Sequence, residues 1–175
     1  MTNTVQTGKT EEMKSAKDII KKVEWYRSEY FIDPKTGDIY DCYRPNIYRC
    51  VKGLARFIEA QDHNHTYQTA LEEIRAGKKK THWIWFVFPQ MAGLGKSEKS
   101  NFYGICHRGE AYDFIENPIL RERLIEATEA VYYNDKSVYE IFGHDAVKVA
   151  CCMKLFASVS DIPIFKKMLE KYCRR

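Results

Sequence analysis

The sequence predicts a mainly α-helical fold, a single helical domain with a short N-terminal β-hairpin. Two observations predict it: apolar residues recur at helical spacing through most of the chain, and residues typical of helix ends separate these segments. A length of 175 residues suffices for one well-packed domain and is too short for two of ordinary size. We expect a helical core domain over residues 54–175, with an N-terminal helix and hairpin extension, residues 1–53, packed on it.

The extension combines an amphipathic pattern with a turn. From Glu11 to Phe31 apolar residues recur at helical spacing with Lys and Glu between them, which predicts a helix. Phe31-Ile32 and Ile39-Tyr40 flank a turn that contains Pro34 and Gly37, which favours a short hairpin.

Three segments follow in the first half of the core. A helical pattern begins after Pro45 and ends near Gln61. The next begins at Thr66, a suitable N-cap, and stops at Gly77, where glycine favours a helix end. The segment 81–90 is apolar on both faces and rich in bulky aromatics, so we expect it to cross the core as a strand or extended segment.

The C-terminal part carries further helix starts. Asn117-Pro118 is typical of an N-cap followed by a proline in the first turn. Asp145 is a suitable cap for a nearly all-apolar helix that runs to Phe156, and Asp161 with Pro163 begins a last helix.

The composition narrows the class of protein. Hydrophobic residues make up 45% and charged residues 30%, which excludes a disordered chain, a collagen-like chain and a coiled-coil rod. The net charge of +4 gives no strong sign of a nucleic-acid partner. Without a long apolar run or a signal peptide pattern, we expect a soluble, cytoplasmic protein that has no membrane partner. The sequence does not predict the oligomeric state.

The six cysteines indicate neither a metal site nor a disulfide framework. No Cys-x-x-Cys occurs, and His63 and His65 lack a Cys or His at the spacing of a structural zinc site, so we expect no metal and no cofactor. Free thiols are favoured. Cys151 and Cys152 lie in an apolar helix and are expected to be inert.

A glycine-containing loop at 93–97 resembles the end of a P-loop. Gln90 stands where a P-loop needs its first glycine, and no strand-to-helix pattern surrounds the loop, so a Walker mechanism is not favoured. Glycines still let backbone N–H groups approach an anion closely. Either the loop is an exposed turn, or a phosphate is held there by Gly93, Gly95, Lys96 and Ser97.

Polar residues also cluster around the aromatic segment. They are Glu59, Gln61, Glu73, Lys79, His82 and Gln90. A structural interpretation has Lys79 or Arg56 neutralising a helix carboxylate, so that the set ties the helices together. A functional interpretation takes Glu59, Glu73 and His82 as catalytic, with Glu59 or Glu73 activating water or stabilising oxocarbenium-like charge. Gln61, Lys79 and Gln90 would then bind the ligand.

Two indoles flank this polar set. Alternation along an extended segment would place His82 on the opposite side from Trp83 and Trp85. Indoles stack on flat heterocycles, so Trp83 or Trp85 could hold a base. Core packing is the alternative, and we expect it for at least one of them.

These motifs resemble a known family. The run His82-Trp83-x-Trp85-Phe86-x-Phe88-Pro89-Gln90, followed by Gly93-Leu94-Gly95-x-Ser97, is similar to the signature of the domain of unknown function 1810, whose bacterial members are often mislabelled calpastatin. The resemblance extends from Leu54 to Phe156. It implies a mainly α-helical fold and brings no established activity.

A more distant similarity is to the NADAR group of helical proteins, which act on ADP-ribose and related N-glycosides. It comprises an Ala-Gln pair that closes a helix, Ala60-Gln61, and a pattern like that from Asn117 to Thr128 before a turn and an apolar helix. The similarity transfers no catalytic role.

The expected function is binding of an ADP-ribose-like or other nucleotide-derived small molecule, with hydrolysis of its N-glycosidic bond as the candidate reaction. Two alternatives belong to other classes: a module that only sequesters such a ligand, and a protein-interaction domain whose aromatic motif is pure core.

Overall fold

The computed structural model describes residues 30–32, 39–41 and 53–173, which are mainly helical, as predicted. The helical elements are α2 (Ala55–Asp62), η2 (His63–His65), α3 (Thr66–Arg75), α4 (Ile84–Val87), α5 (Glu98–Tyr103), α6 (Arg108–Glu116), α7 (Pro118–Tyr132), α8 (Val138–Phe142), η3 (Gly143–Asp145), α9 (Ala146–Val159) and α10 (Pro163–Cys173). Within the described ranges, every helix is too short or too polar to cross a membrane.

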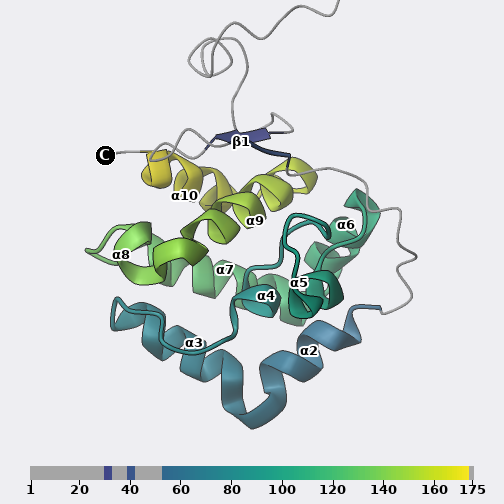
Figure 1. The fold of residues 1–175 in the computed structure, drawn as a ribbon, viewed down its shortest axis with the longest axis horizontal. Coiled ribbons are helices and arrows are strands. Elements are labelled where there is room, and N and C mark those ends of the chain that lie inside the picture. Colours follow the sequence, from purple (N-terminus) through teal and green to yellow (C-terminus); the bar gives the residue numbers. More distant parts are fainter. Residues whose placement is uncertain (1–29, 33–38, 42–52, 174–175) are drawn as a thin grey trace, which may run out of the picture.

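Two short strands precede the helices. Strand β1 (Tyr30–Ile32) pairs antiparallel with β2 (Ile39–Asp41), with Phe31 opposite Tyr40. β1 contacts α9, beside which it lies in Figure 1. The turn between the strands and almost all of the helix predicted from Glu11 lie outside the described residues.

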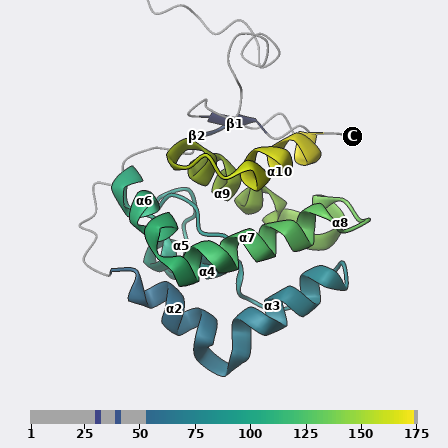
Figure 2. The same ribbon diagram turned by 180° about the vertical axis from the view of Figure 1, so that it is seen from behind.

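The helices form layers around an aromatic core. Helices α2 and α3 make a V on one side, α7 crosses the middle with α6 beside it, and α9 packs on α10 on the other side (Figures 1 and 2). Phe57 of α2 meets Phe114 of α6 edge-to-face at 5.1 Å, and Phe114 contacts Phe156 of α9 at 5.0 Å between ring centroids. The aromatic excess of the sequence therefore connects all three layers.

Helix starts account for much of this arrangement. Asn117 caps α7 as predicted: its Oδ1 accepts from the Leu120 N–H at 3.1 Å, and Pro118 occupies the first turn. Asp145 precedes α9 but makes no side-chain cap, because its carboxylate is bound to two lysines. Thr66 lies within α3 rather than capping it, and its hydroxyl donates to the carbonyl of His63 at 2.5 Å.

The segment 81–90 corrects one prediction. It is not a strand, because Ile84–Val87 forms the single turn α4, in which the Phe88 N–H donates to the Ile84 carbonyl at 3.0 Å. A short run of consecutive apolar residues has the same pattern in a strand and in a helical turn, so periodicity could not distinguish them.

The cysteines follow the prediction in part. Cys151 and Cys152 are free and buried in α9, and burial raises the pKa of the Cys152 thiol well above its ordinary value, as expected of inert groups. Cys106, in contrast, is disulfide-bonded, so the prediction of free thiols is wrong for this residue.

Candidate functional site

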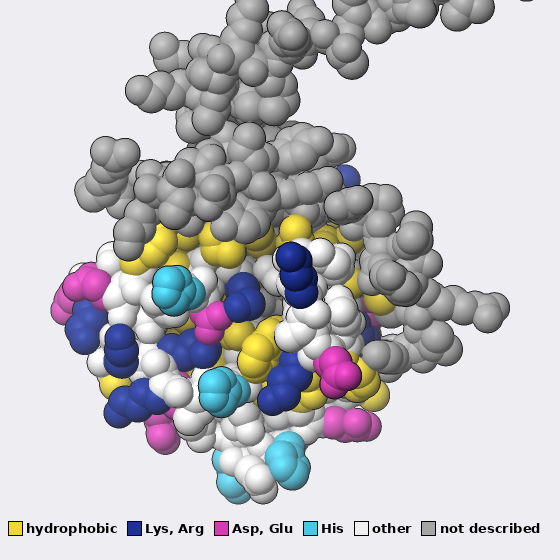
Figure 3. Space-filling model, in the orientation of Figure 1, with side chains coloured by type: hydrophobic (Ala, Val, Ile, Leu, Met, Phe, Trp, Pro, Cys, Tyr) yellow, Lys and Arg dark blue, Asp and Glu magenta, His cyan; other side chains and the backbone are white. Residues whose placement is uncertain are grey.

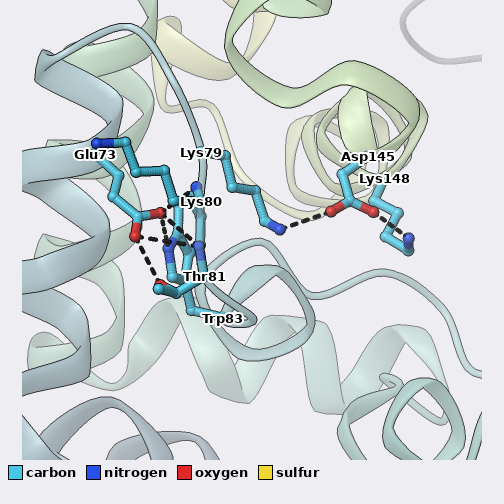
Figure 4. A network of polar contacts seen from close by, with 7 residues as sticks. All are labelled: Glu73, Lys79, Lys80, Thr81, Trp83, Asp145 and Lys148. Atoms are coloured by element: carbon cyan, nitrogen blue, oxygen red, sulfur yellow. Dashed lines mark hydrogen bonds and ion pairs between the residues drawn. The ribbon is translucent and has the colours of Figure 1, made fainter.

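Glu73 of α3 organises the loop of residues 78–83, called here the 78–83 loop. Its carboxylate accepts from the Lys80 N–H at 2.7 Å, from the Thr81 N–H and hydroxyl, and from Trp83 Nε1 at 2.8 Å (Figure 4). Burial raises the pKa of Glu73, but these hydrogen bonds outweigh it and hold the pKa below its ordinary value. The carboxylate is thus ionised, and its oxygens accept hydrogen bonds from the loop that it holds.

Lys79 points from the same loop in another direction, toward α9. Its Nζ lies 2.8 Å from Asp145 Oδ2, and Lys148 Nζ lies 2.5 Å from Asp145 Oδ1 (Figure 4). Burial raises the pKa of Asp145, and the two lysines more than offset that effect, so the pKa is lowered. The Lys79 N–H also donates to the carbonyl of Ile141 at 2.8 Å, which fixes the loop against α8.

An open cleft of about 560 Å³, called here the α2–α5 cleft, lies where α2, α3, α4 and α5 meet. It is lined by Glu59, Ala60, His63, Thr66, Thr69, Thr81, His82, Phe86 and Tyr103. Its size falls in the range of small-molecule sites. Two of the predicted catalytic residues line it: Glu59 from α2 and His82 from the 78–83 loop.

An aromatic group adjoins the cleft. The ring of His82 stacks on Trp85 with 6.4 Å between centroids and 25° between planes, and Lys99 Nζ lies 5.3 Å from the Trp85 ring. Trp85 is half-buried, whereas Trp83 is fully buried and packs edge-on against Phe142. The prediction that His82 faces away from both indoles is therefore wrong for Trp85, because the turn α4 replaces the expected alternation. Core packing of one tryptophan is confirmed for Trp83.

Tyr103 of α5 lines the cleft and is influenced by two nearby charged residues. Burial raises the pKa of the Tyr103 hydroxyl; nearby Arg56 opposes this effect and Glu59 adds to it. Tyr103 is therefore a neutral hydrogen-bonding group at neutral pH, and Glu59 is close enough to influence it. Arg56 itself is occupied, since it pairs with Glu110 at 2.6 Å and donates to the carbonyls of Phe102 and Gly104.

Gln61 and Gln90, two other predicted ligand-binding residues, lie apart from the cleft lining. Gln61 Nε2 donates to the carbonyl of Phe86 at 2.7 Å, and its Oε1 accepts from Arg123 at 3.1 Å, so its amide joins α2 to α4 and α7. Gln90 is buried, and its carbonyl accepts from the Ile105 N–H at 2.9 Å. The side-chain contacts of Gln61 thus tie helices together, and the contact given for Gln90 is made by its backbone.

The glycine loop also has structural roles. Ser97 Oγ caps α5 by accepting from the Ser100 N–H at 3.1 Å. A Cβ on Gly95 would lie 2.1 Å from Ser100 Oγ, so only glycine fits there, and Gly93 has a φ of +91°, which favours glycine. Lys96 is exposed, and none of these residues lines the cleft.

Sequence reasoning missed most of the cleft lining. His63, Thr66 and Thr69 come together because the chain reverses at Asn64 and His65, which have left-handed φ values of 50° and 55°. Non-glycine residues seldom adopt this conformation, and it concentrates at functional sites. The polar run at 62–65 was the available signal, but on its own it indicates only a helix end.

Comparisons with known proteins agree with this fold. The crystal structure of a conserved hypothetical protein, Rv1873 from Mycobacterium tuberculosis, is similar to this chain with 42% identity and a TM-score of 0.65. The match covers 68% of this chain and 86% of that one. No curated protein matches. The family model described as "Protein of unknown function (DUF1810)" matches residues 51–175, and the chain therefore belongs to this family.

Proposed function

We propose that the α2–α5 cleft binds a nucleotide-derived small molecule and hydrolyses its N-glycosidic bond. The observation that supports this most is the convergence of Glu59 and His82 on one cleft whose edge carries the half-buried Trp85. A carboxylate, a titratable ring and an indole are the groups that such a reaction uses. The Tyr103 hydroxyl adds a neutral hydrogen-bonding group, and the three threonine hydroxyls of the lining, which donate to His63, His65 and Glu73, can accept from ribose hydroxyls.

The proposed chemistry assigns one role to each group. Glu59 takes a proton from water, whose oxygen bonds to the anomeric carbon of the sugar. The bond from this carbon to the base nitrogen breaks, the electron pair stays on the nitrogen, and His82 donates a proton to it. The carboxylate of Glu59 also stabilises the positive charge that develops on the sugar. Trp85 stacks on the base.

Glu73 has a different role in this proposal. Its carboxylate is occupied by four donors of the 78–83 loop, and the same loop carries His82. Glu73 is therefore a positioning residue, one that holds Thr81 and His82 at the cleft, rather than a group that activates water.

The first experiment tests for the ligand. Thermal unfolding of the full chain is measured with NAD, ADP-ribose, nucleosides and nucleoside phosphates, and binding to the native state at 100 times Kd should stabilise it by about 2.7 kcal/mol. Chromatography after incubation separates hydrolysis from sequestration. Absence of any stabilisation across this set would contradict both ligand functions and favour a protein-interaction domain.

The second experiment tests the roles. Glu59→Gln should lower kcat by about 10²- to 10⁴-fold with little change in Kd. Trp85→Ala should weaken binding by about 1–3 kcal/mol, and Trp85→Phe should restore most of it. Glu72→Gln, which changes an exposed glutamate on α3 outside the cleft, is the matched control and should leave both constants unchanged. Equal losses in Glu59→Gln and Glu72→Gln would contradict the assignment.

A further inference from the structure

The triad Lys79, Asp145 and Lys148 carries more positive than negative charge. Two ammonium groups share the single carboxylate of Asp145, at 2.8 Å and 2.5 Å, which leaves a surplus of one positive charge. Each ammonium has three N–H donors and gives one to Asp145. Donors therefore remain for a second acceptor at the same place.

Two acidic side chains of the neighbouring elements, Glu73 and Glu140, are bound to other groups. Glu73 is filled by the 78–83 loop, on the side opposite to Asp145 (Figure 4). Glu140 of α8 binds the N–H and hydroxyl of Ser137 in a capping box.

The triad is also held in place. The side chains of Lys79, Asp145 and Lys148 are 11%, 22% and 25% exposed, so water and salt screen them less than fully exposed lysines. Lys79 is fixed through its backbone N–H on Ile141. A preorganised, partly desolvated cation pair is suited to a phosphate, because little side-chain freedom is lost on binding.

One member of the triad, Lys79, is close in sequence to a residue that lines the cleft. Lys79 and His82 belong to the same loop, and three residues span at most about 11 Å. Lys, Arg and His side chains gather around a small hydrophobic surface on the face shown in Figure 3. Because Trp85 follows this loop in α4, a ligand with its base at Trp85 and its phosphate at the triad would extend past the 78–83 loop.

We propose that Lys79, Asp145 and Lys148 form a subsite for a phosphate or pyrophosphate group, and that this group belongs to the ligand of the α2–α5 cleft. The first part rests on the triad alone, and the second rests on the proposed function. The anionic end of the ligand is accordingly assigned to the triad, and the glycine loop is left with its structural roles.

Calorimetric titration of the full chain with inorganic pyrophosphate tests the subsite. Lys148→Met should weaken binding about tenfold or more, as expected for a charged hydrogen bond. Asp145→Asn should strengthen it, because the negative charge between the two lysines is removed. Lys167→Met, which changes an exposed lysine of α10, is the control and should leave binding unchanged.

Opposite signs for Lys148→Met and Asp145→Asn are the distinguishing result, since a merely structural network would lose function in both. If Asp145→Asn does not fold, Lys148→Glu against Lys167→Glu decides: the first should abolish binding and the second should not. Absence of pyrophosphate binding to the unaltered protein at millimolar concentration overturns the subsite, as do equal losses at positions 148 and 167. Pyrophosphate binding without nucleoside binding would leave the subsite standing and contradict the proposed function.

Discussion

Glu73 illustrates how one buried carboxylate can determine the shape of a loop. Its donors come from Lys80, Thr81 and Trp83, so a single side chain fixes two backbone N–H groups, a hydroxyl and an indole. An ionised carboxylate with several donors forms strong hydrogen bonds and keeps a low pKa. His82 lies between Thr81 and Trp83, two of the residues that this carboxylate binds.

Glu73→Gln should destabilise the protein by about 1–3 kcal/mol at pH 7. The NH₂ group of glutamine would face N–H groups of the loop, which then lose an acceptor. The pKa of Glu73 is lower in the folded state than its ordinary value of 4.5, so the carboxylate stabilises the fold fully above that pH. This contribution is lost as the pH falls through the lowered folded-state pKa. Urea unfolding should therefore show a difference between wild type and variant that shrinks in acid.

The control for this prediction is Glu72→Gln. Glu72 is exposed on the same helix, and its substitution should change the free energy of unfolding by less than about 0.5 kcal/mol at either pH. A loss in Glu73→Gln that stays the same from pH 7 to pH 3 would show that the charge of Glu73 is not what stabilises the loop.

Among the helices, an end is predictable from the sequence where a residue at that end caps the backbone N–H groups or adopts the left-handed conformation that stops the helix. Asn117-Pro118 is such a case, and so is Gly77, whose φ of +73° ends α3. Asp145 failed as a cap because distant Lys79 competes for its carboxylate. The prediction for segment 81–90 failed because its central residues, Ile84–Val87, are all apolar and largely buried, which leaves no alternation of polar and apolar positions to detect.

Asn117→Ala should destabilise the protein by about 1 kcal/mol, because the Leu120 N–H loses its acceptor at the start of α7. Asn117→Asp supplies a carboxylate in the same place and should retain most of the stability. Thermal unfolding of both variants measures the difference. If alanine and aspartate destabilise equally, side-chain capping is not what Asn117 contributes.

Across the whole molecule, polar contacts join helices that are far apart in the sequence, and the sequence alone does not predict these contacts. Arg56 of α2 reaches Glu110 of α6, and Gln61 reaches Arg123 of α7. Sequence patterns show which residues are polar or apolar but not which distant residues meet. Glu59 and His82 are candidates because they are polar residues near the aromatic segment in the sequence. Tyr103 lies farther along the chain, and only the fold brings it to the same cleft.

The buried ion pair between Arg56 and Glu110 provides a test of how α2 is held to the rest of the fold. Their side chains are 3% and 9% exposed, so Arg56→Met removes the guanidinium that faces the buried carboxylate of Glu110 and should cost about 3–5 kcal/mol. Glu110→Met should cost a similar amount. The double variant replaces both charges with apolar groups and should lose less than the sum of the two, because no buried charge is left without its partner.

The double variant should still be less stable than wild type, because Arg56 also donates to the carbonyls of Phe102 and Gly104, and Glu110 accepts from the Cys106 N–H at 2.8 Å. Urea unfolding of the four proteins gives the coupling energy directly. Arg75→Met is the matched control: its side chain is 60% exposed in the pair with Glu126, so the loss should stay under about 1 kcal/mol. Strictly additive losses at positions 56 and 110 would mean that the carbonyl contacts of Arg56, and not its charge pair, hold α2 beside the cleft.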